Sequence, residues 1–449
     1  MHDAVFWHRL QFAFTIVFHY LFPPLTMGLA PLIVIWKGIS LRRGGDERLD
    51  AAARFWIRVF GINFALGVVT GIPMEFQFGT NWAGFTRIAG PVVGHTLAME
   101  GLFAFFLESS FLGLLVFGER RLSRRAHFAT AVALFAGSWL SAWFIIATNA
   151  FMQHPVGHSV QADGALALED FFAFLFNPWA VVQYAHNMAA ALVTASFVVA
   201  AVGAFYALQG RHPAAAPLFL RTGTTSGLLS CILVIVPTGD LHAKMVACHQ
   251  PAALAAMEGR FTSGANAPIT LIGQPNVAER RLDNPVHVPS ALSFLAYGTF
   301  HADVPGLDAF PPEEWPDNIE LLYYAFHVMA GLGTVMLLVM AAACGCSFTG
   351  SLPRRRGLLW VLMLAFPLPY IATTAGWMSA ELGRQPWVVH GILRTVDAAS
   401  PTVHTGTAVF TLIGFCVLYF VLGLLFLFLI GREIVHGPAV PATPPGTHA

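Results

Sequence analysis

Long apolar segments, separated by short polar ones, run along almost the whole chain. A helix needs about 20 mostly apolar residues to cross the hydrocarbon core of a membrane, and nine segments meet this requirement. They lie near residues 12–36, 55–71, 92–117, 127–147, 183–208, 218–236, 321–343, 358–377 and 405–430. Because lipid offers the backbone no hydrogen-bond partner, each segment is predicted to be helical. The expected fold is an all-α integral membrane bundle of nine transmembrane helices.

The first of these segments contains Pro23, Pro24 and Pro31. A proline removes a backbone donor and its ring clashes with the preceding helical turn. Kinks are therefore expected in the first span.

The basic residues of the connecting segments predict which side of the membrane each end occupies. Lys or Arg follows the first, third, fifth, seventh and ninth spans, in clusters after the first, third and seventh and singly after the fifth and ninth, whereas residues 150–182, after the fourth span, contain none. Cytoplasmic loops carry an excess of these residues, so the N-terminus is predicted to lie outside and the C-terminus in the cytoplasm. An odd number of spans requires the same arrangement.

Composition agrees with a membrane protein and excludes several other classes. Of 449 residues, 56% are hydrophobic and 11% are charged, against about 25% charged in an ordinary soluble domain. The 24 basic and 24 acidic residues cancel, which leaves no basic footprint for nucleic acid. The five cysteines form no C-x-x-C or C-x-x-C-H motif, so neither a disulfide framework nor a c-type haem is indicated. The first residues lack a basic region and a cleavage site, so the first span is expected to stay in the mature protein.

Two segments fall outside the spans. Residues 237–320 form a predicted outer loop that is longer than structureless connections usually are. Its polar and basic side chains indicate either a surface binding region or a solvated spacer. The tail, 437–449, is rich in proline and is expected to be disordered.

Titratable side chains and one methionine fall at a similar depth in several spans. Ionisable residues in a membrane segment are costly and by default mark function. At 1.5 Å per residue, these positions lie within roughly 15 Å of the outer boundary. They are His19, Glu75, Glu100, His186, His327, Met329 and Glu381. The sequence therefore predicts a polar cluster in the outer half of the bundle.

Histidine, methionine and carboxylate side chains in a phenylalanine-rich bundle indicate haem, because haem iron accepts imidazole and thioether ligands. His327 and Met329 are about 200° apart around a helix, so only one of them can reach a given iron. The spacing leaves that choice open, and His327 is favoured because methionine is commonly a packing residue. A transporter is the alternative, but it predicts midplane sites and repeats that the sequence does not display. A haem-bearing electron-transfer subunit without an oxygen site is a third possibility, disfavoured by Glu100 and Glu381.

Glu108 lies eight residues beyond Glu100, about 12 Å deeper and rotated by about 80° on an α-helix. Such a pair suits a proton relay directed inward. The fourth span adds a polar stripe of Ser138, Ser141, Thr148 and Asn149, which either holds water or, for the hydroxyls, bonds back to its own helix.

These residues lie in stretches that together resemble subunit I of a cytochrome bd-type quinol oxidase over all nine spans. The stretches are Arg9–Phe12 with His19, Glu75–Trp82, Glu100-Gly101, Phe105–Ser109, Asn149 with Met152–Gly157, and Gly376-Trp377 with Glu381 and Gly383–Trp387. The resemblance implies a terminal respiratory enzyme of the bacterial inner membrane. Such an enzyme oxidises quinol outside and reduces dioxygen to water with three haems, separating charge without a proton pump. It also implies a second membrane subunit and, in some members, a small third one.

The resemblance implies a role for each site residue. His186 and Met329 would be the axial ligands of a low-spin haem b, in place of the His327 favoured by spacing. His19 and Glu381 would each bind one of two further haems, a high-spin haem b and a haem d or second high-spin haem b. The remaining residues are Glu100 beside the oxygen-reducing iron, Glu108 on the proton route, Trp377 between haems, Arg384 at haem propionates or carboxylates, and Gln250 and Glu258 in the quinol loop.

Two departures from the best-known members stand out. No Lys occurs in Gln250–Leu254, where those members have one, and His327 replaces an Arg. With the short quinol loop, these features resemble the cyanide-insensitive branch of the family.

Overall fold

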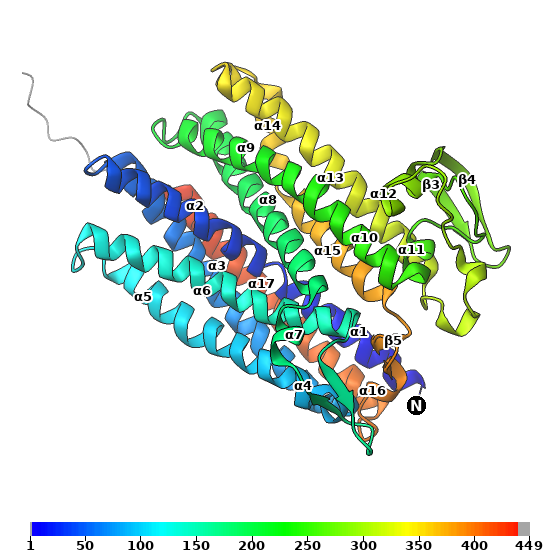
Figure 1. Cartoon of the computed structure of the whole chain (residues 1–449). Coiled ribbons are helices and arrows are strands. Elements are labelled where there is room, and N and C mark those ends of the chain that lie inside the picture. Colours follow the sequence, from blue (N-terminus) through cyan, green and yellow to red (C-terminus); the bar gives the residue numbers. More distant parts are fainter. Residues whose placement is uncertain (1, 439–449) are drawn as a thin grey trace, which may run out of the picture.

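The computed structural model describes residues 2–438; of the predicted tail, residues 439–449 lie outside the described part of the chain. Within residues 2–438, nine helices are long and apolar enough to cross a membrane, so the predicted number of spans is confirmed. These helices run side by side in an elongated bundle (Figure 1). Each predicted window falls inside a longer helical segment, because helices continue past the apolar core into polar ends.

The spans combine the following helices in chain order. The first four are α1 (His2–His19) with α2 (Pro23–Arg42), α3 (Glu47–Thr80), α4 (Ala83–Gly101) with the π-helix η1 (Leu102–Glu108) and α5 (Ser109–Phe117), and α6 (Arg124–Gln153). The other five are α7 (Phe171–Leu175) with α8 (Pro178–Gln209), α9 (Ala216–Leu233) with the π-helix η2 (Val234–Gly239) and α10 (Asp240–His249), α13 (Ile319–Phe348), α14 (Arg356–Leu364) with α15 (Pro367–Gly383), and α17 (Thr405–His436).

The first span is broken at residues 20–22, where the prolines predicted an irregularity. Pro23 and Pro24 are the first two residues of α2, a position where a missing backbone N–H costs nothing. The amide of Asn63 on α3 donates to the Phe22 carbonyl oxygen over 2.7 Å. A neighbouring span thus satisfies a carbonyl group at the break, as helix breaks in membranes require.

The sixth span is longer than its apolar window. Residues 237–249, expected to begin the outer loop, continue the helix through η2 and α10. Pro237 lies inside η2, where π-helical hydrogen bonds span five residues instead of four. The expectation that the loop starts at residue 237 is therefore wrong, because the loop begins only after His249. Within α10, Lys244 pairs with Asp240 over 2.6 Å.

The rest of the outer loop is folded. It contains α11 (Pro251–Met257), the antiparallel strands β3 (Ile269–Asn276) and β4 (Arg281–Val288), and α12 (Ala291–Tyr297). These elements cover one end of the bundle beside α10 and α13 (Figure 1). Two smaller hairpins, β1 (His158–Val160) with β2 (Leu166–Leu168) and β5 (Trp387–Val389) with β6 (Leu393–Arg394), complete the sheet structure of the described residues, and the short helix α16 (Thr395–Ala398) follows β6.

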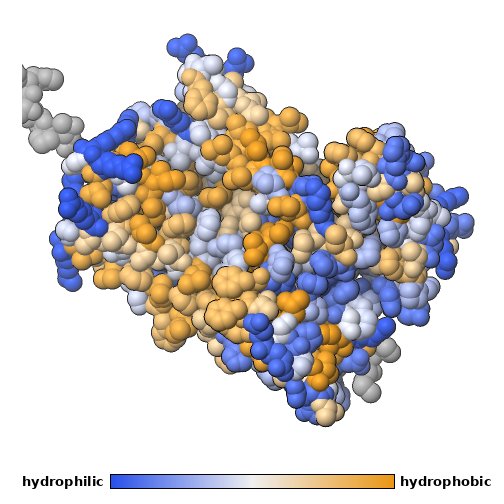
Figure 2. All heavy atoms as spheres, viewed as in Figure 1, coloured by the Kyte–Doolittle hydropathy of each residue, from blue (hydrophilic) through white to orange (hydrophobic). Residues whose placement is uncertain are grey.

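Apolar side chains cover the middle of the bundle surface. In Figure 2, hydrophobic residues occupy the centre of the visible face and hydrophilic residues gather toward its ends. The helix α17 exposes Phe410, Phe420 and Phe428 by 63–78%. Such a surface suits lipid or a membrane partner and would be costly in water. Inside the bundle, Trp36, Trp56 and Phe219 pack as a fully enclosed aromatic core.

Candidate functional site

His19 is the last residue of α1 and faces α3. Its Nδ1 atom lies 3.2 Å from the Thr70 hydroxyl oxygen, and that hydroxyl donates its only hydrogen to the Leu66 carbonyl oxygen over 2.8 Å. The Thr70 oxygen therefore accepts a hydrogen bond from His19. The proton is placed on Nδ1, and the Nε2 lone pair of His19 is left for another partner.

His186 is held in the same way at a different place. Its Nδ1 atom lies 3.3 Å from the hydroxyl oxygen of Thr238 in η2, and Thr238 donates to the Leu233 carbonyl oxygen over 2.9 Å. Again the proton belongs on Nδ1 and Nε2 is free to bind a metal. A second imidazole, that of His242 on α10, lies beside it with ring centroids 5.6 Å apart.

Met329 and His327 on α13 point to different surroundings. The Nε2 and Nδ1 atoms of His327 lie 3.0 and 2.8 Å from the carbonyl oxygens of Thr270 and Tyr323, so this ring is engaged with backbone. Met329 places its sulfur over Gly376 on α15, where an added Cβ would lie only 2.8 Å away. The preference for His327 that spacing alone suggested is not supported, because that imidazole has no nitrogen directed at open space.

Glu381 lies near the C-terminal end of α15 in a network that joins three spans. Its Oε1 atom accepts a 2.8 Å bond from the Asn149 amide, and Asn149 in turn accepts a 2.8 Å bond from Gln183. The other carboxylate oxygen pairs with Arg384. The residues of the predicted polar stripe on the fourth span therefore do different things. Asn149 joins this network, whereas the Thr148 hydroxyl donates to the Phe144 carbonyl oxygen of its own helix.

Arg384 and Trp377 carry buried donors that the described residues do not satisfy. Arg384 is 3% exposed, and its Nε and Nη1 atoms have no hydrogen-bond partner. Burial lowers the pKa of Arg384, and the charge of Glu381 acts in the opposite direction. The indole Nε1 of Trp377 is also buried without a partner. Buried donors without acceptors are costly, so an anionic group with several oxygen atoms fits this place.

Gln250, at the start of α11, anchors the outer loop to the bundle. Its amide donates 2.9 Å bonds to both the carbonyl oxygen and the Oε1 atom of Gln153. Gln153 donates to the Ala380 carbonyl oxygen over 3.2 Å, next to Glu381. The loop is thereby connected to the helix end that carries the Glu381 carboxylate.

Glu258 follows α11 and is 3% exposed. Its Oε2 atom accepts a 3.0 Å bond from the Thr270 backbone N–H on β3. Burial raises the pKa of Glu258 to about 7, although the Thr270 hydrogen bond and the charge of Arg260 favour the ionised form. Such a carboxyl group can take up or release a proton near neutral pH.

The acids of the third span occupy different environments. Glu100 is half-buried near the end of α4, and Glu108 is 5% exposed at the end of η1. The π-helix lies between them, so the rotation of about 80° expected for an α-helix does not apply. Gly137 on α6 lies against this part of the third span, where an added Cβ would be 2.3 Å from the Cδ2 atom of Leu107 and in ordinary contact with Glu108 at 3.7 Å. On α3, Glu75 is exposed.

The sequence did not single out the residues that orient these side chains. Thr70, Thr238, Gln183 and His242 were missed, and Gln153 was noted only as part of a motif. Threonine and glutamine in apolar helices are usually satisfied by their own backbone, and nothing in the local pattern marks these as exceptions. The one available signal was His242, a titratable residue placed directly after an apolar segment.

The donor set fits haem better than a bare metal ion. Among residues 2–438, no group of three or more His, Cys, Asp and Glu side chains could hold a metal ion. Single donors such as His19, His186, Met329 and Glu381 suit an iron whose equatorial positions are filled by a porphyrin. The unpaired guanidinium nitrogens of Arg384 suit haem propionates.

Comparisons with known proteins show which family and fold this chain resembles. Residues 7–438 match the family model described as cytochrome bd terminal oxidase subunit I. A relative from Bacillus subtilis (strain 168), named cytochrome bd ubiquinol oxidase subunit 1, is 35% identical over 440 residues and spans 96% of this chain and 93% of the relative. The cytochrome bd-II ubiquinol oxidase subunit 1 of Escherichia coli (strain K12) is 34% identical over 498 residues, spanning 96% and 95%. The solved structure of bd oxidase from Geobacillus thermodenitrificans superposes with a TM-score of 0.90 at 30% identity, covering 97% of this chain and 99% of that one.

Proposed function

The chain belongs to the cytochrome bd terminal oxidase subunit I family, and from this membership we propose how its residues serve a quinol:oxygen oxidoreductase of the bacterial membrane. The observation that carries the proposal is the matched orientation of His19 and His186. Each donates through Nδ1 to a threonine hydroxyl and keeps Nε2 for iron. Each of these two imidazoles, in separate spans, keeps one nitrogen free of any partner among the described residues, as an iron ligand requires.

The residues divide among three haems. His186 and Met329 hold a low-spin haem b, and His19 and Glu381 each hold one of two further haems, a high-spin haem b and a haem d or second high-spin haem b. Bound haem supplies the electron transfer and the oxygen reduction. Arg384 binds propionate or carboxylate oxygens, Trp377 lies between haems, and Glu100 lies beside the oxygen-reducing iron.

The outer loop binds quinol, with Gln250 and Glu258 as its site residues. Gln250 fixes the loop against Gln153 and so keeps it close to the haem-binding helix ends. Glu258 accepts a quinol proton, because its pKa of about 7 lets the carboxylate be both present and basic near neutral pH. The absence of Lys from Gln250–Leu254, the short quinol loop and His327 together are the reason to place the chain in the cyanide-insensitive branch.

Protons for water formation enter from the cytoplasmic side past Glu108 and then Glu100. Quinol releases its own protons on the outside, while the protons that form water are taken up from the cytoplasm. The two processes together separate charge without a pump. The N-terminus is outside and the C-terminus in the cytoplasm, as the basic residues of the loops predict. Subunit II packs beside this chain in the membrane, and a small third subunit joins some assemblies.

Replacing His186 with Ala in the purified oxidase tests the proposal. The low-spin haem signal in the reduced-minus-oxidised spectrum should disappear, and quinol-dependent oxygen uptake should fall to background. His95→Ala is the matched control, because His95 is also in a span but lies near the Val92 carbonyl oxygen of its own helix. A colourless wild-type protein would contradict the haem-binding role, and an unchanged low-spin signal in His186→Ala would contradict the ligand assignment.

A further inference from the structure

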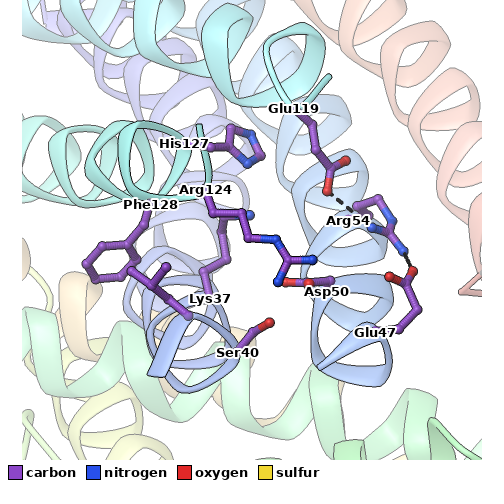
Figure 3. Close-up of a pocket in the computed structure, with 10 residues that line it drawn as sticks. Lys37, Ser40, Glu47, Asp50, Arg54, Glu119, Arg124, His127 and Phe128 are labelled. Carbon is purple, nitrogen blue, oxygen red and sulfur yellow. Dashed lines mark hydrogen bonds and ion pairs between the residues drawn. The ribbon is translucent and has the colours of Figure 1, made fainter. Parts of the chain in front are cut away.

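A polar cavity of about 220 Å³ lies at the end of the bundle opposite the quinol loop. It is formed by the C-terminal part of α2, the first turns of α3, the α5–α6 connection and the first turns of α6 (Figure 3). The haem and quinol residues described above do not line it. The cavity is therefore a separate feature of the chain.

Lys37 reaches into this cavity from α2 (Figure 3). Lys37 is 7% exposed, and no hydrogen bond or ion pair joins its ammonium group to residues 2–438. An ammonium group has three hydrogens to donate, so whatever occupies the cavity must accept them.

Asp50 on the opposite wall is the complementary case. Its carboxylate has no hydrogen bond or ion pair with the described residues, although it faces the same cavity (Figure 3). The other two acids are already engaged, because Arg54 pairs with both Glu47 and Glu119. One cation and one anion are thus left unpaired on opposite sides of one cavity.

The remaining polar groups add to the cationic wall. Arg124 also lines the cavity, and it donates to the Gly44 carbonyl oxygen over 2.7 Å through Nη1. His127 donates through Nε2 to the Leu115 carbonyl oxygen over 2.8 Å, so it contributes no charge in the neutral form. Three cations, Lys37, Arg54 and Arg124, then balance three anions, Glu47, Asp50 and Glu119.

We propose that this cavity binds the phosphoethanolamine headgroup of a membrane lipid. The phosphate accepts hydrogen bonds from Lys37 and Arg124, and the ligand's ammonium group donates to Asp50. A simple anion would satisfy Lys37 but would face the unpaired Asp50 carboxylate, whereas a zwitterion satisfies both walls and keeps the cavity neutral.

A lipid source for this headgroup follows from where the cavity lies. Exposed arginines surround it on the same end of the bundle, and they are Arg42, Arg43, Arg48, Arg121 and Arg125. Basic clusters at a membrane surface attract lipid phosphates. Toward the bundle interior, Leu115, Ala131 and Leu134 are each 2% exposed and belong to one apolar core. A ligand that enters the cavity is therefore kept at the membrane surface.

Native mass spectrometry of the purified oxidase, with all its subunits, can count the bound lipid. After delipidation, short-chain phosphatidylethanolamine should bind the wild type more tightly than phosphatidylglycerol. Lys37→Gln should weaken phosphatidylethanolamine binding about tenfold, the effect of losing one charge-assisted hydrogen bond. Asp50→Asn should abolish the preference for phosphatidylethanolamine over phosphatidylglycerol while phosphate-bearing lipids still bind. Arg48→Gln, an exposed charge outside the cavity, is the matched control and should bind as the wild type does.

Three results would overturn the proposal. Equal phosphatidylethanolamine binding by the wild type and Lys37→Gln would show that the cavity is not the site. A wild type that prefers phosphatidylglycerol would assign the cavity to anionic lipid. Free phosphoethanolamine bound as tightly as the lipid would assign it to a soluble ligand. If Lys37→Gln fails to assemble, as judged by its haem spectrum, the lipid preference of Asp50→Asn decides alone.

Discussion

His186 places its Nδ1 atom 3.3 Å from the hydroxyl oxygen of Thr238, a residue 52 positions later in the chain. Thr238 can only accept this bond, because its hydrogen is given to the Leu233 carbonyl oxygen. Thr238 lies in the π-helix η2, where its hydroxyl reaches the carbonyl oxygen five residues earlier in the chain. An irregular helix in one span therefore fixes the tautomer of a proposed iron ligand in another.

Replacing Thr238 with Val should weaken the proposed low-spin haem site. The variant keeps the shape of the side chain but removes the acceptor, and losing such a partner of a metal-bound histidine typically costs about 10–100-fold in affinity or activity. A potentiometric titration of the low-spin signal should show a shifted midpoint or a reduced amplitude. Thr238→Ser keeps the hydroxyl and should remain close to wild type. If both variants behave alike, the hydroxyl does not orient His186.

Replacing Thr70 with Val should affect a different haem. Thr70 accepts the Nδ1 hydrogen bond of His19 over 3.2 Å, so its loss should alter a high-spin signal and leave the low-spin signal in place. The expected loss of activity is again about 10–100-fold. Absorption and electron paramagnetic resonance spectra of the two threonine variants, compared side by side, provide the measurement. An identical spectral change in both would contradict separate haem sites.

Replacing Asn149 with Ala should disturb the haem assigned to Glu381. The variant removes the 2.8 Å bond to Oε1 and leaves Arg384 as the only described partner of that carboxylate. We expect a broadened or diminished high-spin signal and a loss of oxygen uptake of about tenfold or more. Gln183→Ala should give a smaller change of the same kind, because Gln183 acts on Glu381 only through Asn149. A larger effect of Gln183→Ala would contradict this order.

Replacing Arg384 with Gln should lower the haem content of the purified oxidase. The buried guanidinium has two nitrogens without partners among the described residues, and we expect haem propionates to occupy them. Pigment extraction gives the number of haems per protein. Arg384→Lys retains the charge but not the forked geometry, so it should restore only part of the haem. Full haem content in Arg384→Gln would show that another group binds the propionates.

Replacing Glu258 with Gln should remove a pH-dependent limb of quinol oxidation. Burial raises the pKa of Glu258 to about 7, so the carboxylate that accepts a proton is lost as the pH falls below 7. The wild-type rate should therefore rise with a midpoint near pH 7, and Glu258→Gln should lower it about 100-fold with no such rise. Gln can still accept the Thr270 hydrogen bond. Asp308→Asn, an acid elsewhere in the loop that pairs with Ser263, should keep the pH profile.

The sequence predicted the parts of the fold that depend on local pattern. Apolar length predicted nine spans and the motifs predicted the family, and both are confirmed. Of the three prolines expected to kink the first span, Pro23 and Pro24 follow its break at residues 20–22, whereas Pro31 lies inside α2. The end of the sixth span was misplaced because η2 and α10 are more polar than the apolar window. The sequence did not decide whether the outer loop is a binding region or a solvated spacer. Short strands and helices outside the membrane have only a weak pattern of apolar and polar residues.

The chain by itself determined how many helices are long and apolar enough to cross a membrane, because apolar length is a property of single segments. Only the tertiary structure decided that His327 faces backbone carbonyl oxygens, that Thr70 and Thr238 orient His19 and His186, and that Asn149 and Arg384 hold Glu381. Most of these contacts join residues 51 to 232 positions apart. Hydrogen-bond partners so distant in the chain are chosen by how helices pack, and no local pattern records that choice.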